Sequence, residues 1–305
     1  LRQDAIHCFD QVIEINPEMD QAHFKLGQLY KEADCLEAAV SHYRQAIVLR
    51  PTDAQAHTNL GNLLGEMGQF DEAIVLHQQA ITLQPRFAEA HYNLGNVYRT
   101  TQRLEDAVAA YQQALEYHPE FRAAGINLAV TLNQLDRKAE AMRMLQMQAK
   151  RHPEDVQVCF TLGIFHNDLG QFEAGIAAFH RALSLDPDLA TAHANLSFAY
   201  AQIGNLSEAI RYGERAIVLD PQLNIAHINY GFALTRRGDI LASIDCYREG
   251  LKLHPDSHPL RSNFLLTMNY DPSFSETDIY AAHREFGLWV EAKVTAQVTA
   301  QGGGY

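Results

Sequence analysis

Eight prolines recur along this chain at a fixed interval of 34 residues. They are Pro17, Pro51, Pro85, Pro119, Pro153, Pro187, Pro221 and Pro255. A period of this length is a sequence signature of stacked helix–turn–helix units. Because each unit of such a stack contacts its neighbours along the chain, the period predicts one continuous repeat body rather than separate globular domains.

Each period contains the signals of two helices. We number every unit so that its proline stands at position 32, and the units then begin at Asp20, Ala54, Ala88, Arg122, Val156, Ala190 and Asn224. Apolar residues at i, i+3, i+4 and i+7 spacing over positions 1–14 predict a first helix. Position 15 is Gly68, Gly170, Gly204 or Gly238, and elsewhere Asp34, Gln102 or Asp136, which predicts a left-handed residue after the first helix. The proline ends the second helix.

Small residues stand where the two helices of a unit have to approach each other. In the second unit they are Gly61, Ala73 and Ala80 at positions 8, 20 and 27. A larger side chain there would overpack the contact, at a cost of about 1–3 kcal/mol. With an aromatic residue such as Tyr43 at position 24, the pattern resembles the tetratricopeptide repeat (TPR). The resemblance implies an all-α fold: a right-handed TPR solenoid, which is a superhelix of antiparallel helix pairs.

The repeat register divides the chain into four segments. Residues 1–19 supply only the second helix of a half repeat, 20–257 make seven units, 258–294 hold a capping helix and a junction helix, and 295–305 are expected to form a flexible tail. The half repeat lacks its partner helix and would expose an apolar stripe. Either further repeats precede it, or the stripe pairs with another molecule, including a second copy of the chain.

Composition argues against several classes of partner. A formal net charge of −13 without any basic run argues against nucleic-acid binding. The four cysteines share no short spacing, which indicates neither a zinc site nor a disulfide framework and favours reduced thiols in a cytoplasmic protein. The chain also lacks an apolar run long enough to span a bilayer, so we expect no membrane partner.

Histidine recurs at position 4 and raises the question of a metal site. The residues are His23, His57, His91, His193 and His227. Equivalent helices of a stack lie about 8–10 Å apart, whereas zinc requires nitrogen ligands at about 2.0–2.1 Å. We therefore interpret this column as packing residues and expect neither a metal ion nor a cofactor.

Asparagine recurs at position 6. The residues are Asn59, Asn93, Asn127, Asn195, Asn229 and Asn263, and only Lys25 and Thr161 interrupt the series. At 100° per residue, position 6 points about 200° away from the small residue at position 8, toward the inner wall of the stack. Asn62 and Asn96, at position 9, lie one turn further along the same stripe.

A column of carboxamides can hold a polypeptide. Each one offers two donors and an acceptor, which match the C=O and N–H groups of an extended main chain. These eight asparagines therefore predict a site for extended polypeptide segments that ignores their side chains. The alternative is that asparagine merely suits a polar, exposed helix face.

Two strings carry a finer resemblance. They are HTNLGN (His57–Asn62) and HYNLGN (His91–Asn96), and they resemble the repeats of O-linked N-acetylglucosamine transferases and their Spindly-type relatives. In that family an asparagine ladder holds substrate polypeptides. The resemblance implies the same role for the position-6 asparagines here, in the repeat region of such an enzyme with its catalytic half absent. Asn269–Pro272 and the acidic helix that follows, with Ala282–Gly287 at its core, are similar to the junction that precedes that half, which implies His283 as a candidate for a catalytic role.

We expect no catalytic activity from this chain alone. No strand–helix alternation and no glycine-rich phosphate loop occur in the sequence. One alternative is a generic TPR scaffold for assembling a protein complex. Another is a co-chaperone that grips a carboxylate, but Glu89 stands where such a clamp needs a basic residue.

The unit that begins at Arg122 departs from the pattern. It has Gly125 at position 4 and Gln148 at position 27, where most units have histidine and alanine. The two interpretations are simple drift of the repeat and a flexible joint.

Overall fold

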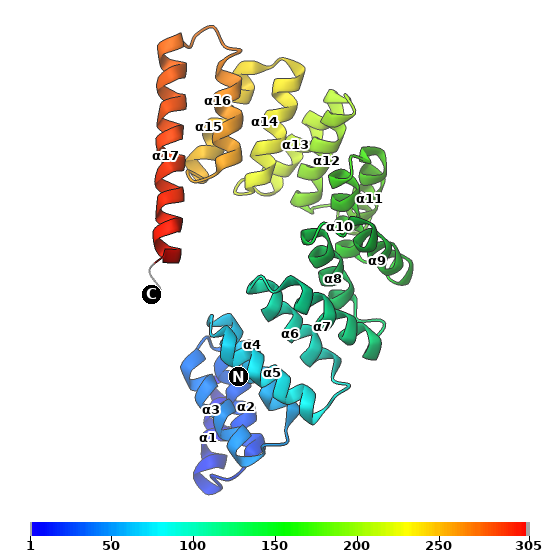
Figure 1. The fold of residues 1–305 in the computed structure, drawn as a ribbon, viewed down its shortest axis with the longest axis vertical. Coiled ribbons are helices and arrows are strands. Elements are labelled where there is room, and N and C mark those ends of the chain that lie inside the picture. The colour runs from blue at the N-terminus through cyan, green and yellow to red at the C-terminus, as the bar shows by residue number, and fades with distance from the viewer. Residues whose placement is uncertain (1, 303–305) are drawn as a thin grey trace. The chain divides into compact units, whose positions relative to one another are not determined.

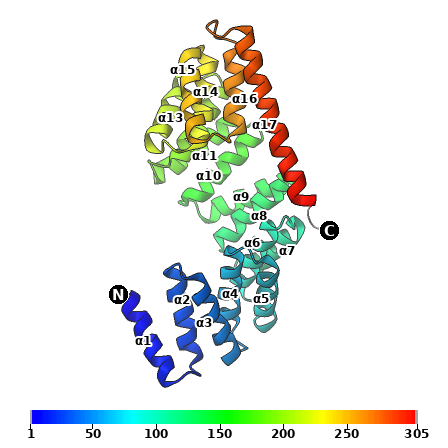
Figure 2. The ribbon, with the colours of Figure 1, turned by 90° about the vertical axis from the view of Figure 1, so that its left-hand side faces the viewer.

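The computed structural model describes residues 2–302, with side chains described for residues 2–293. In that range it contains seventeen α-helices and no strand (Figures 1 and 2). The predicted all-α fold is therefore confirmed. The chain divides into two compact units, Leu1–His152 and Pro153–Tyr305.

The first unit begins with a single helix and continues with helix pairs. The helices are α1 (Arg2–Ile15), α2 (Asp20–Glu32), α3 (Leu36–Leu49), α4 (Ala54–Glu66), α5 (Phe70–Leu83), α6 (Ala88–Thr100), α7 (Leu104–Tyr117), α8 (Arg122–Gln134) and α9 (Lys138–Arg151). Each pair, such as α4 with α5, packs side by side, and α1, α3, α5 and α7 each also contact the first helix of the next pair.

The second unit repeats this arrangement and ends with two further helices. Its helices are α10 (Val156–Asp168), α11 (Phe172–Leu185), α12 (Ala190–Gln202), α13 (Leu206–Leu219), α14 (Asn224–Arg237), α15 (Ile240–Leu253), α16 (His258–Met268) and α17 (Glu276–Gly302). Helix α17 packs on α16, where the rings of Phe286 and Trp289 lie 5.0 and 6.4 Å from the ring of His258.

The turn inside each pair has the backbone that the sequence predicted. Position 15 has a positive φ in all seven units: Asp34 (60°), Gly68 (77°), Gln102 (59°), Asp136 (58°), Gly170 (71°), Gly204 (82°) and Gly238 (93°). This conformation costs an L-residue roughly 1–2 kcal/mol. Four units avoid that cost with glycine, and three do not.

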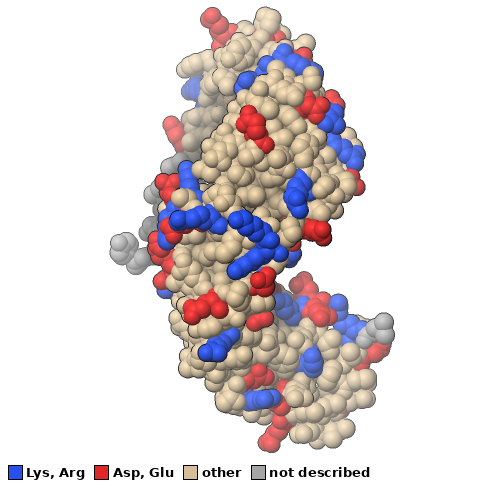
Figure 3. Space-filling view, turned by 90° about the vertical axis from the view of Figure 1, so that its right-hand side faces the viewer, with Lys and Arg blue, Asp and Glu red and all other residues tan. Residues whose placement is uncertain are grey.

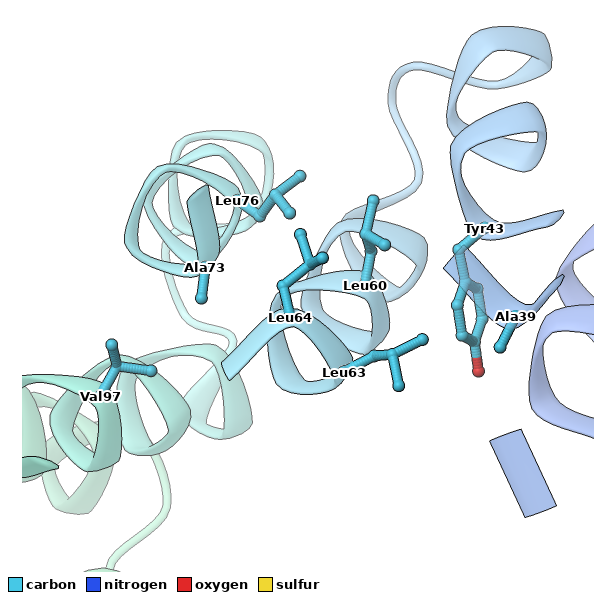
Figure 4. Close-up of a cluster of buried hydrophobic side chains, with 8 residues drawn as sticks. All are labelled: Ala39, Tyr43, Leu60, Leu63, Leu64, Ala73, Leu76 and Val97. Carbon is cyan, nitrogen blue, oxygen red and sulfur yellow. The ribbon is translucent and has the colours of Figure 1, made fainter. Parts of the chain in front are cut away.

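Close helix contacts explain the small residues at position 8. Tyr111 lies over Gly95 so closely that a Cβ there would be 2.7 Å from the ring. Figure 4 shows the same type of contact layer around α4: Leu60, Leu63 and Leu64 of α4 lie between side chains from three neighbouring helices, α3, α5 and α6. The core thus extends continuously from one pair to the next within the unit.

The position-4 histidines are packing residues, as predicted, and they also have a hydrogen-bonding role. All five are buried. In four of them Nε2 lies 2.9–3.2 Å from the carbonyl oxygen of the proline six residues earlier: His23, His91, His193 and His227. A proton on Nε2 can donate to this carbonyl, which lies just beyond the end of the preceding helix.

Two units without this histidine use an arginine instead. Arg151 Nη1 donates to the Pro119 carbonyl oxygen at 2.6 Å, and Arg181 Nε donates to that of Pro153 at 2.8 Å. The prolyl carbonyl is thus hydrogen-bonded by a side chain from either helix of the next unit.

A paired exchange accounts for the unusual unit at Arg122. The fully buried Gln148 side chain occupies the space beside Gly125, where a Cβ would lie 2.1 Å from Gln148 Nε2. Gly125 and Gln148 together therefore replace the usual histidine and alanine. The alternative of a flexible joint stays a prediction.

Both chain ends add detail to the predicted segments. No residue of α1 is buried, and Ile15 is 86% exposed. At the other end α17 runs through residues 295–302, which we expected in a flexible tail. The helix can continue there because residues 294–301 contain neither glycine nor proline. Residues 303–305 of that segment lie outside the described part of the chain.

Candidate peptide-binding face

Four asparagines of the first unit line two adjoining clefts. A cleft of about 290 Å³ between α2 and α4 is lined by Tyr43, Asn59 and Asn62 among others. A second cleft, of about 380 Å³ between α4 and α6, is lined by Asn62, Asn93 and Asn96. Asn62 therefore borders both clefts. The position-6 and position-9 residues of this unit share one open helix face.

The amides on this face differ in how far they are already hydrogen-bonded. Asn96 Oδ1 accepts from Tyr111 Oη at 2.8 Å and from Asn127 Nδ2 at 2.9 Å. Asn59 Oδ1 accepts from Gln55 Nε2 at 3.0 Å.

By contrast, the side-chain amides of Asn62 and Asn93 have no hydrogen-bond partner among the described residues. Each is half-buried and borders a cleft. Their donors and acceptors are therefore free for a ligand.

Several ladder asparagines also support a tyrosine, which we did not predict. Burial raises the pKa of Tyr43 and of Tyr111 to about 12. The Asn59 amide acts against this shift of the pKa at Tyr43, and Arg99 and, to a smaller extent, Asn127 act against it at Tyr111. Both phenols therefore stay neutral at physiological pH. The sequence did hold a signal for this contact, because a position-24 tyrosine stands sixteen residues before these asparagines and before Asn263.

In the second unit the stripe is less uniform. Asn195 Nδ2 donates to Thr191 O within α12 at 2.8 Å, and Asn263 lines a cleft on α16. Asn229 corrects our expectation of an exposed amide: it is 6% exposed, and its Nδ2 donates to Ala194 O at 2.9 Å. It is committed to the packing of α14 on α12.

A missing ring explains why Asn229 is buried. Position 24 is Gly213 in this unit, so no aromatic side chain separates α12 from α14 there. Tyr230 fills the space instead, and a Cβ on Gly213 would lie 2.6 Å from its ring and 2.9 Å from Ser197 Oγ. The two first helices consequently pack directly on each other, with Ser197 Oγ 3.5 Å from Asn229 O.

The remaining candidates are not brought into a site. His283 lies exposed on α17. Within residues 2–293, no three His, Cys, Asp or Glu side chains cluster so that they could hold a metal ion. No helix of the described chain is long and apolar enough to cross a membrane. Basic and acidic side chains are interspersed on the molecular face in Figure 3.

Models of the tetratricopeptide repeat match five stretches of the sequence: residues 36–68, 65–101, 88–121, 166–204 and 190–223. Residues 36–121 and 166–223 therefore carry tetratricopeptide repeats. The TPR architecture expected from the proline period is thereby confirmed. No curated protein matches the sequence.

Several solved structures have a similar fold. A tetratricopeptide repeat protein from Parabacteroides merdae is similar over 82% of this chain and 98% of its own, with 15% identity and a TM-score of 0.65. The Cut9–Hcn1 hetero-tetramer of the APC/C is similar over 87% of this chain and 52% of its own, with 17% identity and a TM-score of 0.65. Pseudomonas aeruginosa PilF is similar over 69% of this chain and 94% of its own, with 18% identity and a TM-score of 0.59. This chain thus spans about half of the matched Cut9–Hcn1 chain. At these identities the likeness shows the fold alone.

Proposed function

We propose that this TPR protein binds extended polypeptide segments of other proteins through their main chain, in the clefts of the first unit. The observation that carries the proposal is the pair of free carboxamides, Asn62 and Asn93, on the 380 Å³ cleft. A carboxamide can donate to a peptide C=O and accept from a peptide N–H at the same time. Such contacts hold a chain without selecting its side chains.

The expected affinity is low. Each hydrogen bond contributes about 0.5–1.5 kcal/mol net, and ordering the bound segment offsets part of that gain. A few such contacts therefore correspond to a Kd in the range of roughly micromolar to millimolar.

The test is binding of a panel of unrelated extended peptides to the protein and to the double variant Asn62→Ala/Asn93→Ala. We expect the double variant to bind every peptide roughly tenfold more weakly, since the substitutions remove about 1.4 kcal/mol or more of net hydrogen bonding. The matched control is Gln112→Ala/Gln146→Ala, which removes two exposed carboxamides from second helices. Peptide binding that survives in the double variant, with its helix content intact, would refute the proposal.

The resemblance of the asparagine-rich strings adds a finer proposal. In an O-linked N-acetylglucosamine transferase-like protein, these repeats would present bound polypeptides to a glycosyltransferase half. This role predicts weak binding of many unrelated sequences and no sugar transfer by the chain alone. Transfer from a nucleotide sugar by the purified chain would contradict it.

A generic scaffold for complex assembly is the alternative function. It is supported by the TPR fold itself, which does not require a transferase. A scaffold predicts tight binding of one or a few partner sequences, unaffected by the two asparagine substitutions. The same peptide panel therefore separates the two functions.

A further inference from the structure

The stripe at position 9 changes chemical character between the two units. In the first unit it is Gln28, Asn62, Asn96 and Val130. In the second it is Ile164, Phe198, Phe232 and Leu266. The rings of Phe198 and Phe232 lie 6.1 Å apart, so the apolar side chains form part of one surface. Position 9 thus carries an amide in three of its four places in the first unit and an apolar side chain in all four places in the second.

This apolar stripe ends at a cleft of about 530 Å³ formed by α14, α15 and α16. Phe232, Leu266 and Tyr270 line it, and Leu266 and Tyr270 are 57% and 60% exposed. A single exposed apolar residue is ordinary, but several around one concave site mark a binding surface. The volume is sufficient for an aromatic or branched aliphatic side chain.

The polar groups in the floor of the cleft are already satisfied. Thr235 Oγ1 lies 2.9 Å from Gly231 O and 2.6 Å from Ser243 Oγ. The floor therefore does not require a polar ligand group.

One charged group at the cleft remains available. Arg236 lines it, with its guanidinium carbon 5.7 Å from the centre of the Phe232 ring, and has no carboxylate partner among the described residues. The nearby Arg237 and Arg248 do pair with acids, namely Asp239 and Asp245. In a chain with a net charge of −13, a free guanidinium beside an apolar cleft favours a ligand with a carboxylate next to its apolar group.

We infer that the second unit adds side-chain selectivity: its cleft binds an aromatic or large aliphatic residue of a polypeptide that also has an acidic residue beside it. The inference rests on the proposed function, because the same polypeptide class is bound. It differs in what is recognised, since the apolar side chain enters the cleft and the carboxylate pairs with Arg236. The Asn263 amide on the cleft wall can hold the main chain between them.

The test uses the full chain and four fluorescein-labelled extended peptides of serine and glycine. Each has one central dipeptide: Trp-Asp, Trp-Lys, Ala-Asp or Ala-Ala. In fluorescence anisotropy, the Trp-Asp peptide should bind most tightly, roughly tenfold more tightly than the Ala-Ala peptide. The Trp-Lys and Ala-Asp peptides should both bind more weakly than the Trp-Asp peptide. Leu266→Asn, which introduces the residue that the first unit has at Asn62 and Asn96, should abolish the advantage of tryptophan. Arg236→Gln should abolish the advantage of aspartate.

Matched controls exclude a general surface effect. Leu241→Asn changes a leucine that is 68% exposed on α15 outside the cleft, and Lys252→Gln removes a positive charge from the same helix. Neither should alter the order of the four peptides. Circular dichroism and the oligomeric state are measured for each variant.

The outcomes separate this inference from the function on which it rests. Equal binding of all four peptides overturns the selectivity and leaves main-chain binding in place. Absence of binding by any peptide refutes both. If Leu266→Asn instead dissociates an oligomer in the absence of peptide, a second copy occupies the cleft and the inference is wrong.

Discussion

At the scale of single residues, His77 is an unusual feature of the first unit. It stands at position 24, where the other units have Tyr, Phe, Leu or, at Gly213, glycine, and its side chain is fully buried over Gly61. Neither ring nitrogen has a hydrogen-bond partner among the described residues. Burial without compensation lowers the pKa of His77 to about 4.

This shift predicts a loss of stability in acid. The unfolded chain binds a proton at His77 near pH 6.5 and the folded chain only near pH 4, so protonation favours unfolding over that window. The free energy of unfolding falls by about 1.4 kcal/mol for each pH unit within this window. We therefore expect the protonation of His77 to lower it by about 2 kcal/mol between pH 7 and pH 4.5. His77→Phe, which copies Phe179 over Gly163, should lack this component.

Urea unfolding of both proteins at the two pH values measures the difference. An equal loss of stability in the wild type and in His77→Phe would show that this histidine is not buried in its neutral form.

Residue-scale compensation is the part of the structure that the sequence analysis missed. Single columns showed Gly125 and Gln148 as departures from the repeat. They did not show that Gln148 fills the space beside Gly125 or that Tyr230 fills the space over Gly213. The partners stand many residues apart, so their pairing depends on packing between helices rather than on the period. The burial of Asn229 follows from one of these exchanges.

At the scale of helices and turns, the sequence was a better guide. Proline and the position-15 residues predicted where helices end, because both act through local backbone geometry. The face of the asparagine stripe also followed from helical periodicity. The hydrogen bonds of its members did not, since these depend on tyrosines from the second helix of the same pair or of the preceding pair.

The turn between α6 and α7 offers a prediction at this scale. Gln102 has a φ of 59°, and in four other units glycine takes this position. We expect Gln102→Gly to stabilise the protein by about 1 kcal/mol, because relief of the left-handed strain exceeds the entropy that glycine adds to the unfolded chain. The control is Gln112→Gly in the interior of α7, where φ is helical and the same change should destabilise by about 1 kcal/mol. Two changes of the same sign in thermal unfolding would contradict this account.

At the scale of the whole molecule, periodicity and compactness give different information. The 34-residue period passes from Pro119 through Pro153 to Pro187 without a break. The chain nevertheless divides into two compact units after His152. A period records that each repeat has neighbours, but not how strongly each pair of neighbours is coupled.

This division predicts that a local perturbation stays within its own unit. The protonation of His77 destabilises the core around α4 and α5, which belongs to the first unit. At pH 5 we therefore expect His77→Phe to slow amide hydrogen exchange in residues 20–151 relative to the wild type and to leave exchange in residues 156–268 unchanged. At pH 7 His77 is mostly neutral in both the folded and the unfolded chain. The part of the exchange difference between His77→Phe and the wild type that arises from protonation of His77 should therefore disappear. Peptide-resolved exchange by mass spectrometry measures both ranges in one experiment. Slower exchange across both ranges at pH 5 would mean that the whole chain unfolds as one cooperative body, because stabilising one unit would then protect the other.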